Sequence, residues 1–72
     1  MTQDTSAKYI ELNTFLKIFL KIPTGGQAKV LIREGKVKVN DQIETRNKRK
    51  LHAGDIIELE NQKIELKAEM IK

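Results

Sequence analysis

Residues 24–40 read TGGQAKVLIREGKVKVN, in which the signal for a helix is followed at once by the signal for a strand. Thr24 and Gln27 have the spacing of a capping box, where a hydroxyl accepts from the third helical amide and the glutamine side chain reaches back. Gly35 suits the left-handed residue that ends a helix. The buried stripe between these two signals would consist of Ala28, Leu31 and Ile32.

After Gly35 the hydrophobic period changes from 3.6 to 2. Val37 and Val39 would face the core, while the alternating positions are polar or basic: Lys36, Lys38 and Asn40. This alternation is typical of a half-buried strand with a basic outer face. Asn40–Asp41 then favours a tight turn into Ile43, because Asn and Asp are common in such turns.

Another helix is expected before this stretch. Its apolar positions recur at i, i+3, i+4, i+7 and i+8, and they are Leu12, Phe15, Leu16, Phe19 and Leu20. This spacing favours the core over base stacking for both phenylalanines. Pro23 is expected to end the helix, since proline disfavours helical dihedrals in the residue before it. Residues 9–11 are expected to form a short strand ahead of it.

The second half of the chain predicts antiparallel strands. Residues 46–50 (RNKRK) lack apolar alternation and are expected to form an exposed loop whose far end is anchored by Leu51. Turns at residues 53–55 and 61–62 would bound a strand over residues 56–60, and the last strand would alternate through Ile64, Leu66, Ala68 and Met70. The order predicts an α+β fold in which two packed helices lie against a small antiparallel sheet.

Length and composition bound the function. The chain has 72 residues and no cysteine, which excludes disulfides, thiolate zinc sites and cysteine nucleophiles. His52 is the sole imidazole and has no nucleophile signature nearby, so we expect no enzyme activity, no metal and no cofactor. With two Phe, one Tyr and no Trp, a platform that stacks several bases is not expected.

The same composition indicates a single domain over residues 8–72 after a flexible segment at residues 1–7. The most apolar run, residues 15–22, is interrupted by two lysines, so no membrane partner is expected. The first residues lack the pattern of a signal peptide, which favours a cytoplasmic protein. We also expect a monomer.

The positive charge is concentrated in the middle of the chain. Fourteen Lys and Arg against ten Asp and Glu give a net charge of +4. Residues 36–52 hold six basic and two acidic residues, whereas residues 53–72 hold three basic and five acidic ones. Because a patch of one sign attracts polyanions, this distribution favours an anionic partner over a merely solvated surface.

Two features of the second helix suit phosphate. Gly25 and Gly26 would lie in its first turn, where free amides and the helix dipole attract anions and no side chain blocks the approach. The alternative is that these glycines only permit close packing. Lys29 and Arg33 would share one exposed face, as phosphate contacts or as an ordinary solvated face. For His52 an ordinary surface position is favoured over a phosphate contact.

Four runs carry a resemblance to a known family. They are FLK at residues 15–17, TGGQAK at 24–29, IREGKVKVN at 32–40 and LHAGDII at 51–57. In order and spacing they resemble the RNA-binding domain named after ribosomal protein S4, also called the αL motif, and most of all its small stand-alone bacterial members. The resemblance covers about residues 10–60. It implies two helices packed on a small antiparallel sheet and a domain that grips structured RNA.

The resemblance also implies a set of RNA-facing residues at the second helix, the strand after it and the turn: Gly25, Gly26, Gln27, Lys29, Arg33, Lys36, Lys38 and Asn40. The exposed loop would add its cations to this surface, namely Arg46, Lys48, Arg49 and Lys50. The chain departs from many members in having glycines rather than basic residues at positions 25 and 26, Glu11 in place of an Arg, and Asp41 where a glycine is common.

The leading hypothesis is a non-catalytic protein that binds structured RNA, plausibly ribosomal RNA or a ribosome-assembly intermediate. With few aromatic residues, recognition would rest on backbone and shape, which suits double-stranded RNA. One alternative is a protein-interaction adaptor that uses the acidic residues of its last strands, Glu58, Glu60, Glu65 and Glu69. Another is a reader of duplex DNA.

Overall fold

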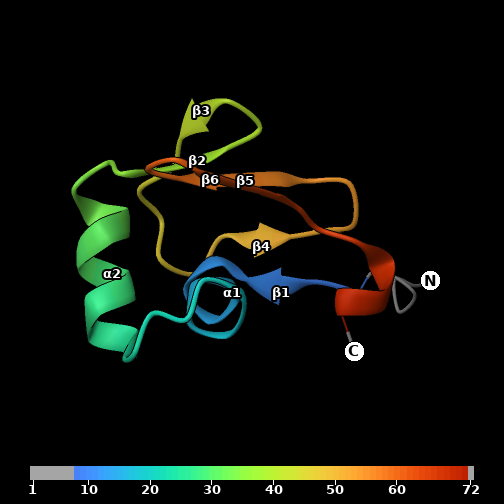
Figure 1. Cartoon of the computed structure of the whole chain (residues 1–72), viewed down its shortest axis with the longest axis horizontal. Coiled ribbons are helices and arrows are strands. Elements are labelled where there is room, and N and C mark those ends of the chain that lie inside the picture. The colour runs from blue at the N-terminus through green and yellow to red at the C-terminus, as the bar shows by residue number, and fades with distance from the viewer. Residues whose placement is uncertain (1–7, 72) are drawn as a thin grey trace.

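A computed structural model describes residues 8–71, so the expectation for residues 1–7 lies outside the described part of the chain. The elements follow the order expected from the sequence (Figure 1). They are β1 (Ile10–Glu11), α1 (Leu12–Phe19), α2 (Gly25–Arg33), β2 (Val37–Val39), β3 (Gln42–Ile43), β4 (Lys50–Leu51), β5 (Ile56–Leu59), β6 (Gln62–Glu65) and the 3₁₀ helix η1 (Ala68–Met70).

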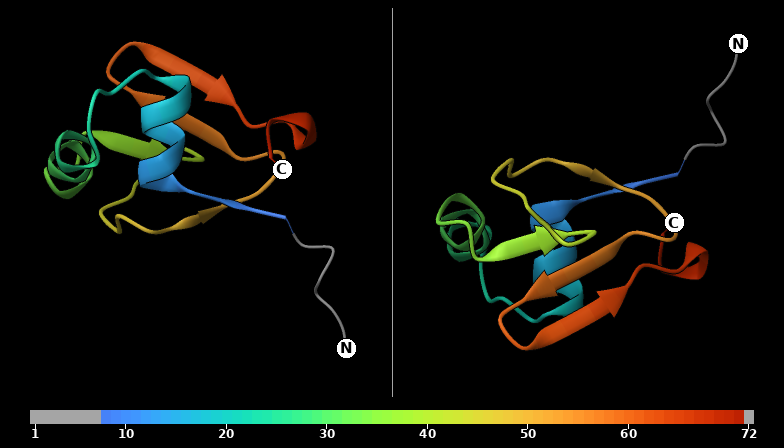
Figure 2. Two further views of the ribbon diagram at one scale, coloured as in Figure 1. Left: turned by 90° about the horizontal axis from the view of Figure 1, so that it is seen from below. Right: turned by 90° about the horizontal axis from the view of Figure 1, so that it is seen from above.

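The strands form two antiparallel sheets. The larger sheet has the order β3-β2-β5-β6, and the smaller one pairs β1 with β4. Helix α1 lies across one face of the larger sheet, and α2 stands beside it at one end (Figures 1 and 2). The core between them contains Leu12, Phe15, Leu16, Ala28, Ile32, Val37, Val39, Leu51, Ile57, Leu59 and Leu66. The predicted α+β architecture is confirmed.

Helix α1 ends earlier than the position of Pro23 requires. Its last helical residue is Phe19, and Lys21 adopts a left-handed backbone with φ 58°. The amide of Ile22 donates to the carbonyl of Leu16 at 3.2 Å, which satisfies one acceptor of the last turn. The expectation that Pro23 ends the helix was therefore wrong, because the chain turns away before proline acts.

Helix α2 begins and ends at the predicted signals. The Thr24 hydroxyl accepts from the amide of Gln27 at 3.1 Å, as an N-cap does. Among the hydrogen bonds of residues 8–71 the reciprocal half of the capping box, from the Thr24 amide to the Gln27 side chain, is not formed. Gly35 has φ 78°, so it provides the predicted left-handed stop.

Two boundaries near the C-terminus differ from the predictions. The turn after β5 lies at Glu60–Asn61, with Glu60 at φ 55°, one residue earlier than expected. The last strand ends at Glu65, which pairs with Ile56, the first residue of β5. Beyond Glu65 the backbone of Leu66 bonds to the turn before β5, at Gly54 and Asp55, and the chain then bends into η1. The apolar alternation through Ala68 and Met70 therefore does not correspond to a strand.

Candidate nucleic-acid interface

The loop between β3 and β4 forms a concave basic surface beside the start of α1. Within residues 8–71, the side chains that line a groove of about 510 Å³ are all cationic: Arg46, Lys48, Arg49 and Lys50. We call this surface the basic groove. The loop is fixed to the helix, since the carbonyl of Arg49 accepts from the amide of Leu12 at 2.9 Å and that of Asn47 accepts from Asn13 at 3.1 Å. It therefore also caps the free amides of α1.

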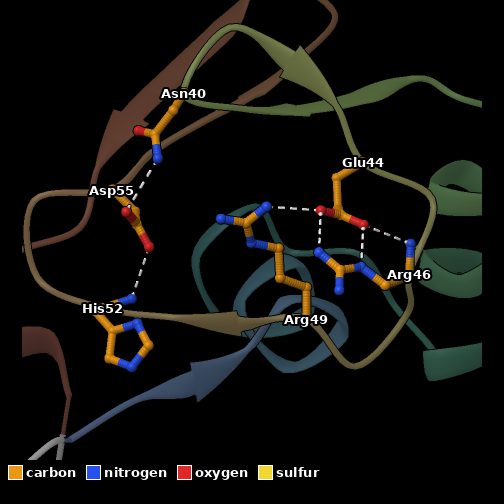
Figure 3. Close-up of polar contacts among 6 residues, drawn as sticks. All are labelled: Asn40, Glu44, Arg46, Arg49, His52 and Asp55. Atoms are coloured by element: carbon orange, nitrogen blue, oxygen red, sulfur yellow. Dashed lines mark hydrogen bonds and ion pairs between the residues drawn. The ribbon is translucent and has the colours of Figure 1, made fainter.

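Glu44, which sequence reasoning did not select, holds two of these cations in place (Figure 3). Its side chain is 9% exposed, and Oε2 accepts from the Arg46 amide at 2.9 Å and from Arg46 Nε at 3.0 Å. Oε1 accepts from Arg49 Nη1 at 2.7 Å and from Arg46 Nη2 at 3.3 Å. The fork of Arg46 is thus bound by both carboxylate oxygens.

These contacts stabilise the charged form of Glu44. Hydrogen bonds from Arg46, with a further one from Arg49, lower the pKa of this carboxyl from 4.5 to about 2, although burial acts in the opposite direction. In return, the carboxylate raises the pKa of Arg46. Glu44 therefore carries a full negative charge at neutral pH, and the basic groove keeps a net surplus of three positive charges.

The predicted exposed loop is thus in closer contact with the rest of the fold than expected. Lys50 belongs to β4, where it lies opposite Glu11, and the side chain of Arg49 is only 30% exposed. Within residues 8–71, no ion pair involves Lys48 or Lys50. Leu51 is fully buried, as expected of the residue that anchors the loop. In this groove, the two lysines therefore differ from Arg46 and Arg49, which are paired with Glu44.

The start of α2 has room for a ligand. A Cβ added to Gly26 would meet nothing closer than the Thr24 hydroxyl at 3.9 Å, and one added to Gly25 would lie 3.9 Å from Lys17 Nζ. Neither glycine has a positive φ. Close packing therefore does not require glycine at either position. Lys17, which sequence reasoning gave no role, brings a further cation to this helix start.

The remaining candidate residues differ in their surroundings. Gln27, Lys29 and Arg33 are exposed on α2, the last two one turn apart. Lys36 lies 4.0 Å from Glu34, and Lys38 is exposed on the outer sheet face between Ile43 and Glu58. The loop of the basic groove lies on the same side of the molecule as α2 (Figures 1 and 2).

Asn40 has a structural task. Its Nδ2 donates to Asp55 Oδ1 at 3.1 Å, and its Oδ1 accepts from the amide of Ile56 at 2.9 Å. Asp55 Oδ2 in turn accepts from the amide of His52 at 2.8 Å (Figure 3). These contacts join the β2–β3 turn to the β4–β5 turn, so both polar groups of the Asn40 side chain are already engaged.

Two of the four glutamates in the last part of the chain lie beside lysines. Glu58 lies in register between Lys38 and Lys63, and Glu65 Oε1 is 3.8 Å from Lys67 Nζ.

Within residues 8–71, no helix is long and apolar enough to cross a membrane, and no three His, Asp or Glu side chains gather as a metal site would need.

Comparison with known proteins agrees with this geometry. The family model described as "S4 domain" matches residues 4–67. The chain is 45% identical over 51 residues to RlbA of Bacillus subtilis, which is named as a probable ribosome maturation protein. These 51 residues cover 71% of this chain and 72% of the relative. It is 35% identical over 60 residues to YbcJ of Escherichia coli, which is named as a candidate RNA-binding protein. These 60 residues cover 83% of this chain and 86% of YbcJ. The chain belongs to the S4 domain family.

Proposed function

We propose that this protein is a non-catalytic RNA-binding protein that docks on structured RNA, either ribosomal RNA or a ribosome-assembly intermediate. The observation that carries the proposal is the basic groove, in which four cationic side chains converge and two of them are held by a buried carboxylate. The names of two relatives, a ribosome maturation protein and a candidate RNA-binding protein, support the same reading.

The groove suits a phosphate backbone. Arg46 and Arg49 each use part of their guanidinium group on Glu44, so their remaining N–H groups point in restricted directions and can donate to phosphate oxygens. Lys48 and Lys50 act as point charges beside them. Contacts of this kind read the path of the backbone and not the base sequence, which fits a folded or double-stranded RNA.

The start and exposed face of α2 form the second part of the proposed interface. The free amides at Gly25 and Gly26 attract a phosphate, and Lys17 lies beside them. Lys29 and Arg33 extend the positive surface along the helix. Lys36, Lys38 and Gln27 would contribute at its margin, whereas Asn40 would act by holding the neighbouring turns together.

A mobility-shift titration with structured ribosomal RNA fragments tests this function. With four to six phosphate contacts, the slope of log K against log salt should be roughly −3 to −5. A DNA duplex of matched length serves as competitor, since a protein that reads A-form geometry and 2′-hydroxyls should prefer RNA. Absence of salt-sensitive RNA binding, or equal binding of DNA, would contradict the proposal.

Charge-reversal variants locate the surface. Lys48→Glu with Lys50→Glu should weaken RNA binding by about tenfold or more and reduce the salt slope by about 2, because two phosphate contacts are lost. The matched control is Lys63→Glu with Lys67→Glu, which changes the net charge equally at β6 and the segment after it, outside the lining of the basic groove. Equal weakening by both pairs would mean that net charge alone attracts the RNA.

A further inference from the structure

A third surface connects the basic groove with an apolar one. Tyr9 is 44% exposed, and the Lys50 ammonium lies over its ring at 4.9 Å from the centroid. The centroid of the His52 ring is 6.4 Å from the centroid of the Tyr9 ring, and the two ring planes form an angle of 54°. Because Lys50 also lines the basic groove, an anion bound to this lysine would lie directly beside the Tyr9 ring.

Tyr9 also lines an apolar groove of about 340 Å³, which we call the Tyr9 groove. The residues around it come from β1, α1 and the C-terminal end of the described chain: Tyr9, Ile10, Ile18, Phe19, Met70 and Ile71. Ile18 is 57% exposed although it is apolar. A groove of this size lies within the range of small-ligand sites, and none of the residues that line it within 8–71 is charged.

We propose that the Tyr9 groove receives one unpaired nucleobase of the RNA whose backbone lies in the basic groove. This inference rests on the proposed function and adds a second recognition element to it. A base and its own phosphate are separated by a single sugar, so a nucleotide whose phosphate meets Lys50 can reach Tyr9 with its base. Stacking on an aromatic ring stabilises a bound base whichever of the four bases it is.

The low aromatic content does not oppose this arrangement. A platform for several bases needs several exposed rings, whereas one nucleotide beside a duplex needs one. The Lys50 ammonium over Tyr9 keeps the ring in a fixed place beside the phosphate path, and such a cation–π contact is itself favourable. The RNA bound best should therefore be a duplex or stem that ends in a single-stranded nucleotide.

Three RNA hairpins with the same stem test the proposal: a blunt one, one with a two-nucleotide extension, and one whose extension is abasic. The wild-type protein should bind the extended hairpin at least about fivefold more tightly than the abasic one, which has the same phosphates but no bases. Tyr9→Leu should remove this difference between the extended and the abasic hairpin, while Tyr9→Phe should retain it.

Two further measurements need no change at Tyr9. Since Tyr9 is the sole tyrosine and the chain has no tryptophan, the intrinsic tyrosine emission of the wild type should fall with the extended hairpin and not with the abasic one. Ile18→Ala should reduce the preference for bases by about twofold or more. Equal affinity for extended and abasic hairpins, with salt-sensitive blunt binding intact, would overturn the base site but leave the proposed function standing.

The experiments also distinguish a nucleobase from a second copy of the chain as the occupant of the Tyr9 groove. If the wild type self-associates, Tyr9→Leu abolishes the association, and bases have no effect on RNA affinity, then a second copy fills the groove and the proposal fails. If none of the hairpins binds in a salt-dependent way, the proposed function itself fails, which is a different outcome from loss of the base preference alone.

Discussion

Glu44 illustrates what one residue does for the interface. It lies in the run ETRNKRK, where a carboxylate among cations resembles an ordinary solvated charge. In the folded protein it is buried and receives four hydrogen bonds, all from Arg46 and Arg49. The contribution of such a carboxylate to stability depends on its partners, because a buried charge is tolerated only when it is paired.

The pKa of Glu44 makes its contribution to stability dependent on pH. Since this pKa falls from 4.5 to about 2 on folding, the stabilisation is fully present above pH 4.5 and is lost as the pH falls toward about 2. Because the Arg46 side chain is mostly exposed, solvent screening keeps the contribution to stability below the roughly 3 kcal/mol to which the full shift corresponds. Glu44→Gln should therefore lower the free energy of unfolding at neutral pH, and the difference from wild type should shrink between pH 5 and pH 2 in urea titrations.

The exposed carboxylate of Glu65 provides the control. Its ion pair with Lys67 spans 3.8 Å and both side chains are more than half exposed, so Glu65→Gln should change stability by less than about 1 kcal/mol at any pH. Parallel pH profiles for wild type and Glu44→Gln would show that the carboxylate does not stabilise the loop through its charge.

At the scale of the elements, the start of α2 separates packing from binding. Gly26→Ala should raise the free energy of unfolding by up to about 1 kcal/mol, because alanine favours helix and the added methyl group meets nothing closer than 3.9 Å. If a phosphate rests on the helix amides, the same methyl group should weaken RNA binding. Thermal unfolding and a mobility shift measure the two effects; unchanged RNA affinity would remove Gly26 from the interface.

The β2–β3 turn carries backbone strain of a known kind. Asn40 and Asp41 have φ values of 54° and 69°, as in a type I′ turn, whose second position favours glycine. Asp41→Gly should therefore stabilise the protein by up to about 1 kcal/mol, which a urea titration measures. Gly35→Ala provides the opposite case at φ 78° and should destabilise it by roughly 1 kcal/mol. Two changes of the same sign would contradict this account.

At the scale of the whole molecule, the basic groove and the exposed face of α2 should contact one RNA together. Lys29→Glu with Arg33→Glu, and Lys48→Glu with Lys50→Glu, should each lower the salt slope by about 2. The four changes combined should lower the slope by about 4, because distant contacts contribute additively to log K. Mobility shifts at several salt concentrations measure these slopes.

The melting temperature is the control for this set. All four side chains are exposed, so the variants should melt close to the wild type. If the α2 pair alone had no effect on affinity or slope, the helix face would be an ordinary solvated surface, and the interface would be confined to the basic groove.

Local patterns predicted most of the architecture. The stripe of α1, the N-cap at Thr24 and the stop at Gly35 depend on residues within one or two helical turns of each other, so sequence alone could identify them. The last strand was predicted too long, since alternation continues past Glu65 while its partner strand does not. Strand ends depend on the neighbouring strand, which the local pattern does not contain.

Composition and local periodicity were enough to predict the fold class, the concentration of positive charge in residues 36–52 and the cations that could serve an interface. The folded protein was needed to show which of those cations converge, that Glu44 holds Arg46 and Arg49, and that Lys50 lies over Tyr9. The difference lies in the range of the interactions. Helix periodicity and capping arise from neighbours along the chain, whereas a groove depends on distant segments that the core alone brings together.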